Sequence, residues 1–315
     1  MYRISLFTLL FLVFNSALLA QDYVDLFKFT YLNSPFNKED SVEGPARVQE
    51  FYVDLTVPIK LSDRTAIITG AIIEQLSVNT SPSGFNVTSV FSTTLKLGVN
   101  LSHGKRWQGT YIILPKVAGD FNHSPTTQIQ LGGLALYKFN KKDNLKYRIG
   151  LYYNTELFGP FFVPLLGVYY LSPNKKFEMN FTLPVWADMN YRFTEHIAAG
   201  LNFSAFLRSY NISPASTVSG KEMYMVKASN EIYGYLQYTA KKSFIFQAKA
   251  GWSIGRRFSA YDIDEKVGWG FSAFRFDDDR TQQNRDISDG FIFQARFIYR
   301  FNLEPSDKSD ELGLK

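Results

Sequence analysis

Residues 291–302 alternate between an apolar, mostly aromatic set and a set that is mainly polar. The odd positions, from Phe291 to Phe301, are aromatic or alanine, whereas the even positions include Gln294, Arg296 and Arg300. Because a β-strand points alternate side chains to opposite faces, this pattern predicts one aromatic face and one polar face. The alternation recurs along most of the chain. A barrel in a membrane needs an apolar exterior and a polar interior on every strand, so the pattern predicts a transmembrane β-barrel.

Turn residues divide this alternation into fourteen predicted strands: 24–32, 47–61, 65–77, 87–101, 107–117, 127–139, 145–156, 163–171, 177–183, 188–193, 197–209, 224–240, 243–258 and 290–302. Short connections recur at every second link, and longer ones alternate with them. Outer-membrane barrels have short periplasmic turns and longer outside loops. This arrangement predicts that both termini lie in the periplasm.

The strand count depends on residues 177–193. If Leu183-Pro-Val-Trp186 is a turn, two short strands flank it and the barrel has fourteen strands. If the segment is one strand, twelve strands remain possible. Strands of about seven residues are short for a spanning wall, which typically needs about 9–11. Either the wall dips here, where lipophilic cargo could leave sideways, or the strands extend further. We predict an all-β, antiparallel outer-membrane barrel of 12–14 strands and favour fourteen.

The two ends of the sequence differ from the region between them. Residues 1–20 contain Arg3, a short apolar run and a small-residue site ending at Ala20, which is typical of a cleaved signal peptide. The barrel domain is expected over residues 21–303. Residues 304–315 are polar and predict a disordered periplasmic tail.

Composition narrows the class of protein. Aromatic residues make up 17% of the chain, yet mean hydropathy is −0.14, a combination expected of a barrel with a polar interior. The sequence has no cysteine, which excludes disulfides, thiolate metal sites and a lipoprotein anchor. The net charge of +5 is a mild bias, and no basic stripe interleaved with aromatics indicates nucleic-acid binding.

Candidate catalytic residues are few. Gly251-Trp-Ser-Ile-Gly255 matches the nucleophile-elbow pattern, but an elbow needs a strand, a sharp turn and a helix. The surrounding alternation instead predicts that Ser253 is a lumen-facing strand residue. The three histidines, His103, His123 and His196, fall in predicted turns and loops, where solvated surface roles are more common than catalysis. No catalytic residue is therefore assigned, although a lipid-modifying barrel enzyme stays open as a third hypothesis.

The longest predicted loop, 259–289, is rich in acidic residues. Carboxylates could hold calcium, but their spacing fits no EF-hand, and arginines lie among them. A solvated loop is favoured, and no metal or cofactor is predicted. Long loops without evident structure are often functional, so this one is a candidate plug or recognition surface. The acidic residues considered as ligands are Asp262, Asp264, Glu265, Asp277, Asp278 and Asp279.

The polar face of the predicted strands is mainly basic. Its predicted cations are Lys28, Lys60, Lys96, Lys138, Lys146, Arg148, Arg192, Arg208, Lys249, Arg296 and Arg300, and its acids are Asp54, Glu156, Glu178 and Asp188. A basic lumen favours anions, because charge rings set the selectivity of pores. Alternatively, the charges form ion pairs that fill a closed interior. Glu178 and Asp188 could face each other across a hairpin, with Arg192 as an ion-pair partner.

The chain resembles the outer-membrane β-barrel proteins grouped as a domain of unknown function in Gram-negative bacteria of the Bacteroidetes type. The resemblance rests on the signal peptide, on Pro164-Leu-Leu-Gly-Val-Tyr-Tyr-Leu-Ser-Pro-Asn-Lys-Lys176, on Phe177-Glu-Met-Asn-Phe-Thr-Leu-Pro184 and on Asp188-Met-Asn-Tyr-Arg192. It covers nearly the whole mature chain. The family has no established reaction or cargo, so the resemblance assigns no functional residue.

These observations favour a passive pore for small solutes, with anions preferred. The alternative is a structural or surface-interaction barrel with a filled interior, and an enzyme acting on lipid or lipopolysaccharide comes third. The expected partners are outer-membrane lipid, lipopolysaccharide, the barrel-assembly machinery and a small anionic solute.

Overall fold

The computed structural model describes residues 23–37, 46–79, 89–121, 129–284 and 288–302. Sixteen strands account for most of these residues, with one short 3₁₀ turn, η2 (Pro214–Ser216). The strands are β1 (Tyr23–Asn37), β2 (Ala46–Lys60), β3 (Thr65–Asn79), β4 (Ser89–Ser102), β5 (Trp107–Gly119), β6 (Gln130–Lys142), β7 (Leu145–Glu156), β8 (Gly159–Leu171), β9 (Phe177–Leu183), β10 (Trp186–Arg192), β11 (Ile197–Ile212), β12 (Met223–Ala240), β13 (Phe244–Asp262), β14 (Trp269–Phe271), β15 (Phe274–Phe276) and β16 (Phe291–Asn302).

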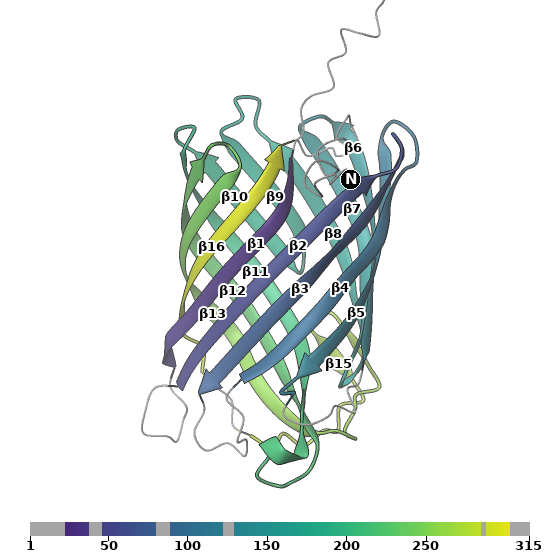
Figure 1. The fold of residues 1–315 in the computed structure, drawn as a ribbon, viewed down its shortest axis with the longest axis vertical. Coiled ribbons are helices and arrows are strands. Elements are labelled where there is room, and N and C mark those ends of the chain that lie inside the picture. Colours follow the sequence, from purple (N-terminus) through teal and green to yellow (C-terminus); the bar gives the residue numbers. More distant parts are fainter. Residues whose placement is uncertain (1–22, 38–45, 80–88, 122–128, 285–287, 303–315) are drawn as a thin grey trace, which may run out of the picture.

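The strands close into one barrel of antiparallel neighbours (Figure 1). The ring closes where β1 pairs with β16 over ten register positions, from Tyr23↔Asn302 to Asn33↔Phe293. The two shortest strands, β14 and β15, form a hairpin beside β8, outside the ring. Of the sixteen strands described, fourteen therefore form the barrel. The prediction of an all-β, fourteen-stranded antiparallel barrel is confirmed, and the alternative of twelve strands is wrong.

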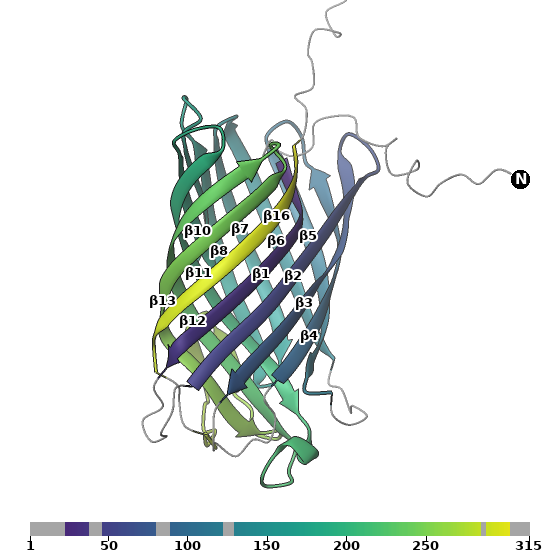
Figure 2. The same ribbon diagram turned by 60° about the vertical axis from the view of Figure 1, so that its left-hand side comes forward.

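The two ends of the barrel differ in their connections. At one end, hereafter the turn end, short turns follow β2, β4, β6, β8, β10 and β12. Tyr23 and Asn302 pair at this same end, which lies at the top of Figures 1 and 2. The longer connections lie at the opposite end, hereafter the loop end. The alternation of short and long links matches the sequence prediction, except that two links at the loop end have two residues each: Leu157 and Phe158 between β7 and β8, and Pro184 and Val185 between β9 and β10.

The barrel wall is lower at β9 and β10, which have seven residues each. β8 pairs with β9 only from Leu166 to Leu171. Towards the loop end, Phe161 and Phe162 of β8 pair instead with the β14–β15 hairpin. β9 has its predicted bounds, and β10 begins two residues earlier and ends one residue earlier than predicted, so the structure has the two short strands of the first alternative.

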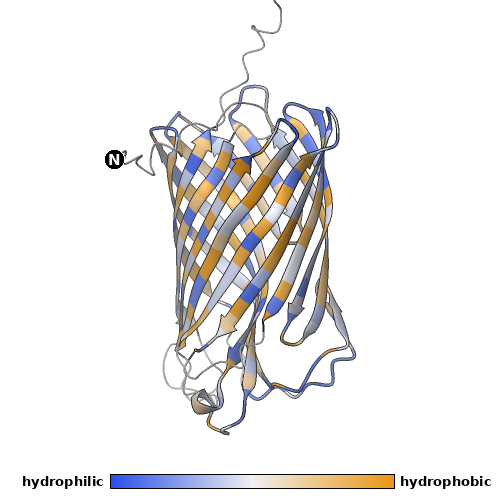
Figure 3. Ribbon diagram, turned by 45° about the vertical axis from the view of Figure 1, so that its right-hand side comes forward, coloured by the Kyte–Doolittle hydropathy of each residue, from blue (hydrophilic) through white to orange (hydrophobic). Residues whose placement is uncertain are grey.

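The two surfaces of the wall have opposite character, and alternating apolar and polar residues follow each strand in Figure 3. Large apolar side chains are exposed on the outer surface, among them Leu97, Ile113, Ile149, Leu166, Leu201, Leu236, Phe246 and Phe293. Intervening positions carry buried polar side chains such as Asn100, Gln108, Lys146, Asn202, Gln247 and Gln294. No helix among the described residues is long and apolar enough to cross a membrane.

Substituting Phe297 by arginine tests the assignment of the lipid face. Phe297 lies in an outer aromatic cluster, with ring centroids 5.2 Å from Phe246 and 6.2 Å from Phe27. A buried guanidinium in lipid costs about 2–4 kcal/mol near the bilayer midplane. The variant should unfold at lower urea in lipid vesicles, whereas Gln294→Ala, on the opposite face, should change the midpoint little. Equal tolerance of both changes would mean that the faces are reversed.

Candidate functional site

Three strands leave the wall at the loop end and cross the interior. The β13–β16 ladder stops at Trp252↔Phe291, and the β10–β11 ladder stops at Trp186↔Ser204. The β11–β12 and β12–β13 ladders continue to Ile212↔Met223 and Met223↔Asp262. Residues 205–212, 223–230 and 254–262 therefore form a three-stranded sheet beyond the ends of both wall ladders, hereafter the inner sheet. Its β11 strand reaches the far wall, where Asn211 pairs with Gly119 of β5.

Apolar side chains fix both faces of the inner sheet. One face packs against β2–β5 through a cluster of Val48, Leu76, Val90, Ala118, Tyr210, Ile212, Met223, Met225, Phe258 and Ala260. The other face packs against β8 and the connections beside it through Leu157, Phe158, Phe161, Val163, Leu165, Tyr224, Val226 and Val267. The interior at the loop end is therefore filled on both sides of the sheet. The η2 turn at the end of the β11–β12 hairpin lies at the bottom of Figure 2.

A bulge at Gly255 marks the point where β13 departs from β16. Gly255 has φ +63°, a left-handed conformation that favours glycine. The Asp289 carboxylate accepts hydrogen bonds from the backbone N–H groups of Gly255 (3.0 Å) and Arg256 (2.8 Å). An extra residue in one strand bends that strand and increases its twist. The bulge therefore turns β13 into the barrel.

Replacing Gly255 by valine should weaken this turn. A β-branched residue held at positive φ costs about 1–3 kcal/mol. The variant should assemble as a barrel but expose the inner sheet, measured as faster protease cleavage between residues 205 and 262. Gly104→Val is the matched control, because Gly104 also has positive φ but lies in a turn-end connection. Equal cleavage of the two variants would contradict a role for the bulge.

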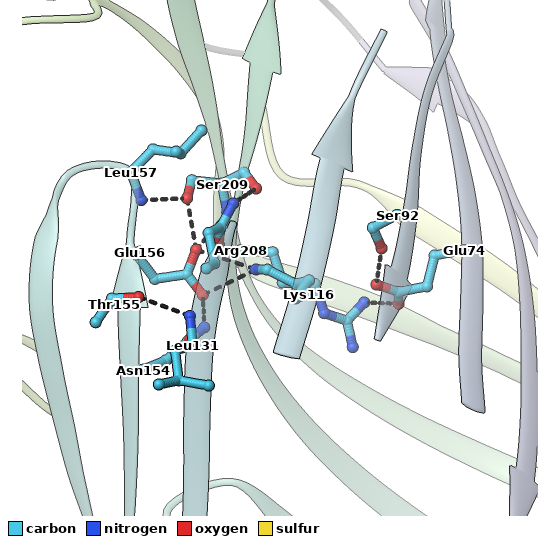
Figure 4. Close-up of polar contacts among 11 residues, drawn as sticks. Glu74, Ser92, Lys116, Leu131, Asn154, Thr155, Glu156, Leu157, Arg208 and Ser209 are labelled. Carbon is cyan, nitrogen blue, oxygen red and sulfur yellow. Dashed lines mark hydrogen bonds and ion pairs between the residues drawn. The ribbon is translucent and has the colours of Figure 1, made fainter. Parts of the chain in front are cut away.

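Ion pairs tie the inner sheet to the wall. Arg208 of β11 pairs with Glu74 of β3, which also accepts a hydrogen bond from the Ser92 hydroxyl at 2.9 Å (Figure 4). Lys227 of β12 pairs with Glu50 of β2, and the lysine side chain is 2% exposed. Both pairs join segments far apart in sequence. They form a latch between the inner sheet and the β2–β3 wall.

Glu156 is the centre of a second network, at the end of β7. Its carboxylate accepts hydrogen bonds from Lys116 Nζ at 3.1 and 3.2 Å (Figure 4). It also accepts from the Ser209 backbone N–H (2.8 Å), the Ser209 hydroxyl (2.5 Å) and the Asn154 amide. The network joins the wall strands β5 and β7 to β11. Because its members are buried, the carboxylate depends on these donors.

The turn-end half of the barrel contains further charge pairs. Lys96 pairs with Asp54 and donates to Thr56 Oγ1 at 2.7 Å. The lysine reaches them across β3 at Gly70, where any Cβ would lie 2.1 Å from the Leu55 carbonyl oxygen. Nearby, Arg300 pairs with Asp25 at 2.6 Å and lies 3.5 Å from the Tyr23 ring centroid. Local charges are therefore largely matched here.

Two more predicted lumen cations form ion pairs, Lys28 with Asp25 at 3.7 Å and Lys60 with Asp63 at 2.8 Å, and four others contact neutral groups. Lys249 Nζ donates to Asn202 Oδ1 at 3.1 Å, and Arg296 Nε donates to Thr30 Oγ1 at 3.1 Å. Arg148 donates to Asn180 Oδ1 at 2.6 Å. Lys146 Nζ lies 4.8 Å from the Tyr169 ring centroid.

The predicted contact between Glu178 and Asp188 is wrong. The β9–β10 register pairs Glu178 with Asn190 and Asp188 with Asn180. Each carboxylate accepts a tyrosine hydroxyl instead, Glu178 from Tyr23 (2.7 Å) and Asp188 from Tyr235 (2.9 Å). Arg192 is exposed at the end of β10, and no ion pair joins it to either acid among the described residues. The shortness of β10 places this arginine outside the interior network.

Four acids in the interior were not among the predicted lumen residues: Asp25, Glu50, Glu74 and Glu231. Asp25 precedes a register shift between Asp25 and Phe27, so it does not follow the parity of the rest of β1. Glu50 shares the parity of Asp54 and Lys60 on β2, so simple alternation places it on the inner face with them. The interior is therefore less basic than predicted from the sequence.

The loop after β13 folds around Arg280. Its guanidinium carbon lies 4.1 Å from the Tyr261 ring centroid, and its nitrogens bond to Asp278 at 2.7 and 2.8 Å. These hydrogen bonds hold the pKa of the Asp278 carboxyl below its usual range. Glu265 accepts the backbone N–H of Thr281 at 3.0 Å. Among the described residues, no group of three or more acidic or histidine side chains is arranged to hold a metal.

The residues considered for catalysis are dispersed. Ser253 is buried within β13, where its hydroxyl donates to the Gly290 carbonyl at 3.2 Å. His196 Nδ1 lies 2.9 Å from the Thr239 carbonyl oxygen, and His103 stacks against Tyr137 at 6.1 Å. His123 lies outside the described residues. In the described part of the chain, neither histidine forms a hydrogen bond with a serine or a carboxylate.

Known proteins match this chain in its fold. An outer-membrane channel from Pseudomonas putida F1 matches with 8% identity and TM-score 0.42, covering 92% of this chain and 98% of that one. The NanC porin matches with 9% identity and TM-score 0.34, covering 86% and 98%. The TodX monoaromatic hydrocarbon channel, as a deletion mutant, matches with 10% identity and TM-score 0.37, covering 89% and 91%. At these identities and TM-scores the similarity assigns no activity or cargo to this chain.

Sequence comparison gives the family. No curated protein matches the chain. The model of a domain of unknown function, DUF6268, matches residues 17–267, which is most of the chain. The protein is thus an outer-membrane β-barrel that belongs to the DUF6268 family.

Proposed function

We propose that this barrel is a channel for small solutes and that the inner sheet is its gate. The observation that carries the proposal is the polar interior of the turn-end half. Buried side-chain oxygens of Asn100, Asn140 and Gln247 have no hydrogen-bond partner there among the described residues. Buried polar atoms are satisfied by protein or by water, so these oxygens favour a hydrated interior over a packed core.

The way in which the inner sheet is held supports a gating role. At the loop end it fills the interior, and it is attached to the wall by apolar packing and by the latch pairs Arg208–Glu74 and Lys227–Glu50. Backbone pairing between the inner sheet and the wall is sparse. Past the points where β11 leaves β10 and β13 leaves β16, the described residues contain one register pair to the wall, Asn211↔Gly119. Side-chain contacts can be exchanged for water more readily than a continuous ladder. The sheet can therefore move while the fourteen-stranded wall stays closed.

Planar-bilayer recording of the refolded protein tests this function. We expect rare, discrete openings, with a reversal potential across a salt gradient that indicates anion preference. The preference follows from interior cations that bond to neutral groups and form no ion pair within the described ranges, such as Lys249 and Arg148. A correctly folded barrel that passes no current, even after the latch acids are removed, would refute the channel and favour a structural barrel with a filled interior.

The proposal includes a location. We place the barrel in the outer membrane of a Gram-negative bacterium of the Bacteroidetes type, with the turn end and both termini in the periplasm. The loop end and the inner sheet then face outwards, beside lipopolysaccharide. Insertion would require the barrel-assembly machinery. Protease added to whole cells should cut the loop-end connections and spare the turns.

A further inference from the structure

The β14–β15 hairpin, which lies outside the ring, has an aromatic face that the channel does not use. Its register pairs Trp269 with Phe276 and Phe271 with Phe274, so all four rings lie on one face of the hairpin. These four residues, hereafter the aromatic face, are between 40% and 66% exposed. Soluble surfaces rarely leave a large continuous apolar patch in water without a partner for it. The aromatic face therefore needs an apolar partner.

The remaining positions of the hairpin point the opposite way. Gly270 and Arg275 face each other between the two aromatic pairs. A Cβ at Gly270 would lie 2.9 Å from Cδ2 of Phe161, on the inner side of β8. The Arg275 guanidinium carbon lies 4.9 Å from the Phe161 ring centroid and 5.2 Å from that of Phe158. A hairpin in water would bury its rings and expose its arginine, so this hairpin has the inside-out arrangement of the barrel wall.

The aromatic face continues the lipid-facing surface of the wall. β14 pairs with β8 on the edge that β9 leaves free beyond Leu166. Phe271 lies opposite Phe162 there, and the Phe162 ring centroid is 4.8 Å from that of Tyr153 on β7. A row of aromatic residues therefore runs from β7 across β8 onto the hairpin. Outer-membrane barrels have such aromatic girdles where their apolar band meets the membrane interface.

Backbone groups at the tip of the hairpin have partners within the protein. The Ser272 N–H donates to the Phe162 carbonyl oxygen at 2.8 Å. The Arg275 guanidinium donates to the carbonyl oxygens of Ser272 and Phe274 at 3.1 and 2.7 Å. Where water is excluded by lipid, backbone groups must be satisfied by the protein itself. These hydrogen bonds fit a hairpin tip that lies against lipid.

We propose that the aromatic face binds the acyl chains of the bilayer leaflet at the loop end and completes the lipid-facing wall beside the short strands β9 and β10. Continuity with the lipid-facing surface of β7 and β8 and the inside-out arrangement of the hairpin identify acyl chains as the occupant. Asp277, Asp278 and Asp279 follow the last ring directly, which places the base of the hairpin among polar headgroups. The inference goes beyond the channel, because this contact does not depend on conduction.

Fluorescence quenching in vesicles tests the occupant. The chain has four tryptophans, and replacing Trp107, Trp186 and Trp252 by phenylalanine leaves Trp269 as the single emitter. The full-length protein is refolded into phosphatidylcholine vesicles with brominated acyl chains, and iodide serves as the aqueous quencher. We expect the brominated lipid to quench Trp269 and iodide to have little effect on it.

Two other single-tryptophan proteins provide matched controls. Trp252, exposed on the outer surface of β13, should lose as large a fraction of its emission in brominated lipid as Trp269 does. Val218→Trp, with the four native tryptophans replaced by phenylalanine, is the negative control. Val218 lies in the β11–β12 connection at the loop end and is 70% exposed. Its tryptophan should respond to iodide and not to brominated lipid.

A charge on the aromatic face should displace it from the lipid. In the protein that retains only Trp269, Phe274→Asp should remove most of the quenching by brominated lipid and increase the quenching by iodide, because a carboxylate is unfavourable among acyl chains. Val218→Asp adds the same charge elsewhere at the loop end and should change neither. Equal effects of the two substitutions would contradict the proposal.

Other results would also overturn the proposal. Quenching of Trp269 by iodide alone would mean that the aromatic face meets water. Quenching by neither agent would mean that protein covers the face, for example a second copy of the chain.

A second measurement applies if the triple replacement does not refold. The chain has no cysteine, so Phe274→Cys carries a nitroxide label at a single position. Collisions of this label with oxygen, which concentrates in lipid, should exceed its collisions with a water-soluble nickel chelate. The reverse order would overturn the proposal.

Discussion

Replacing Glu50 and Glu74 together by glutamine is expected to convert a mostly closed channel into a mostly open one. Each change removes the anionic partner of a cation on the inner sheet, Lys227 or Arg208. Removing one member of a buried ion pair costs about 3–5 kcal/mol, because the remaining charge is left without compensation. The cost falls on the closed state, since an inner sheet that swings out exposes both cations to water.

The size of this effect determines what a bilayer recording should show. About 5.5 kcal/mol moves a two-state equilibrium from 1:99 to 99:1. Two broken pairs reach that value, so the double variant should stay open for most of the recording. Each single variant should show an intermediate open probability. Lys227 and Arg208 both lie near the Phe206 ring, at 5.4 and 4.8 Å, so the two changes need not be additive.

Asp63→Asn is the control for this experiment. It removes the same charge from an ion pair, but Asp63 lies in a turn-end connection and its side chain is 90% exposed. Exposed pairs contribute little, so open probability should not change. If the double variant folds and its current equals that of the control, the latch does not hold a gate and the inner sheet is a fixed plug.

The positions of the strands could be predicted from the sequence because each strand faces lipid on one side and a polar interior on the other. The short strands β9 and β10 show this well: alternation from Phe177 to Leu183 and around Met189 was enough to place them. The turns could also be predicted, because polar turn residues interrupt the alternation. Pairing of the first strand with the last followed from the prediction of a barrel, because a barrel is a closed sheet.

The inner sheet could not be predicted from the sequence. Residues 205–212 continue the alternation of β11. Their local sequence does not indicate that β10 is no longer their neighbour, or that they contact the opposite wall of the barrel. Its partners are distant in the chain: Lys227 and Glu50 are separated by 177 positions. Loop 259–289 was a candidate plug, yet the plug consists mainly of the extended ends of β11, β12 and β13. Periodicity identifies a strand and its faces, but it does not identify the surface that each face meets.

Glu156→Gln is expected to be the most destabilising single change in the polar interior. The glutamine would retain one acceptor oxygen, while its amide would place donor hydrogens against Lys116, Ser209 or Asn154. Lys116 would keep its charge without a partner at 8% side-chain exposure. A loss of about 3–5 kcal/mol is expected from breaking a buried pair in this way. Urea unfolding in vesicles measures this loss.

A second substitution distinguishes charge imbalance from simple loss of packing. Lys116→Met in the Glu156→Gln background removes the uncompensated ammonium and keeps a side chain of similar length. Because replacing both members of a buried pair is often close to neutral, the double variant should recover most of the lost stability. Recovery would show that the network holds the inner sheet through matched charge. If stability does not recover, the hydrogen bonds from Ser209 to the Glu156 carboxylate would be the main contribution of this network to stability. The attachment of β11 to β7 would then depend on that carboxylate as an acceptor and not on its charge.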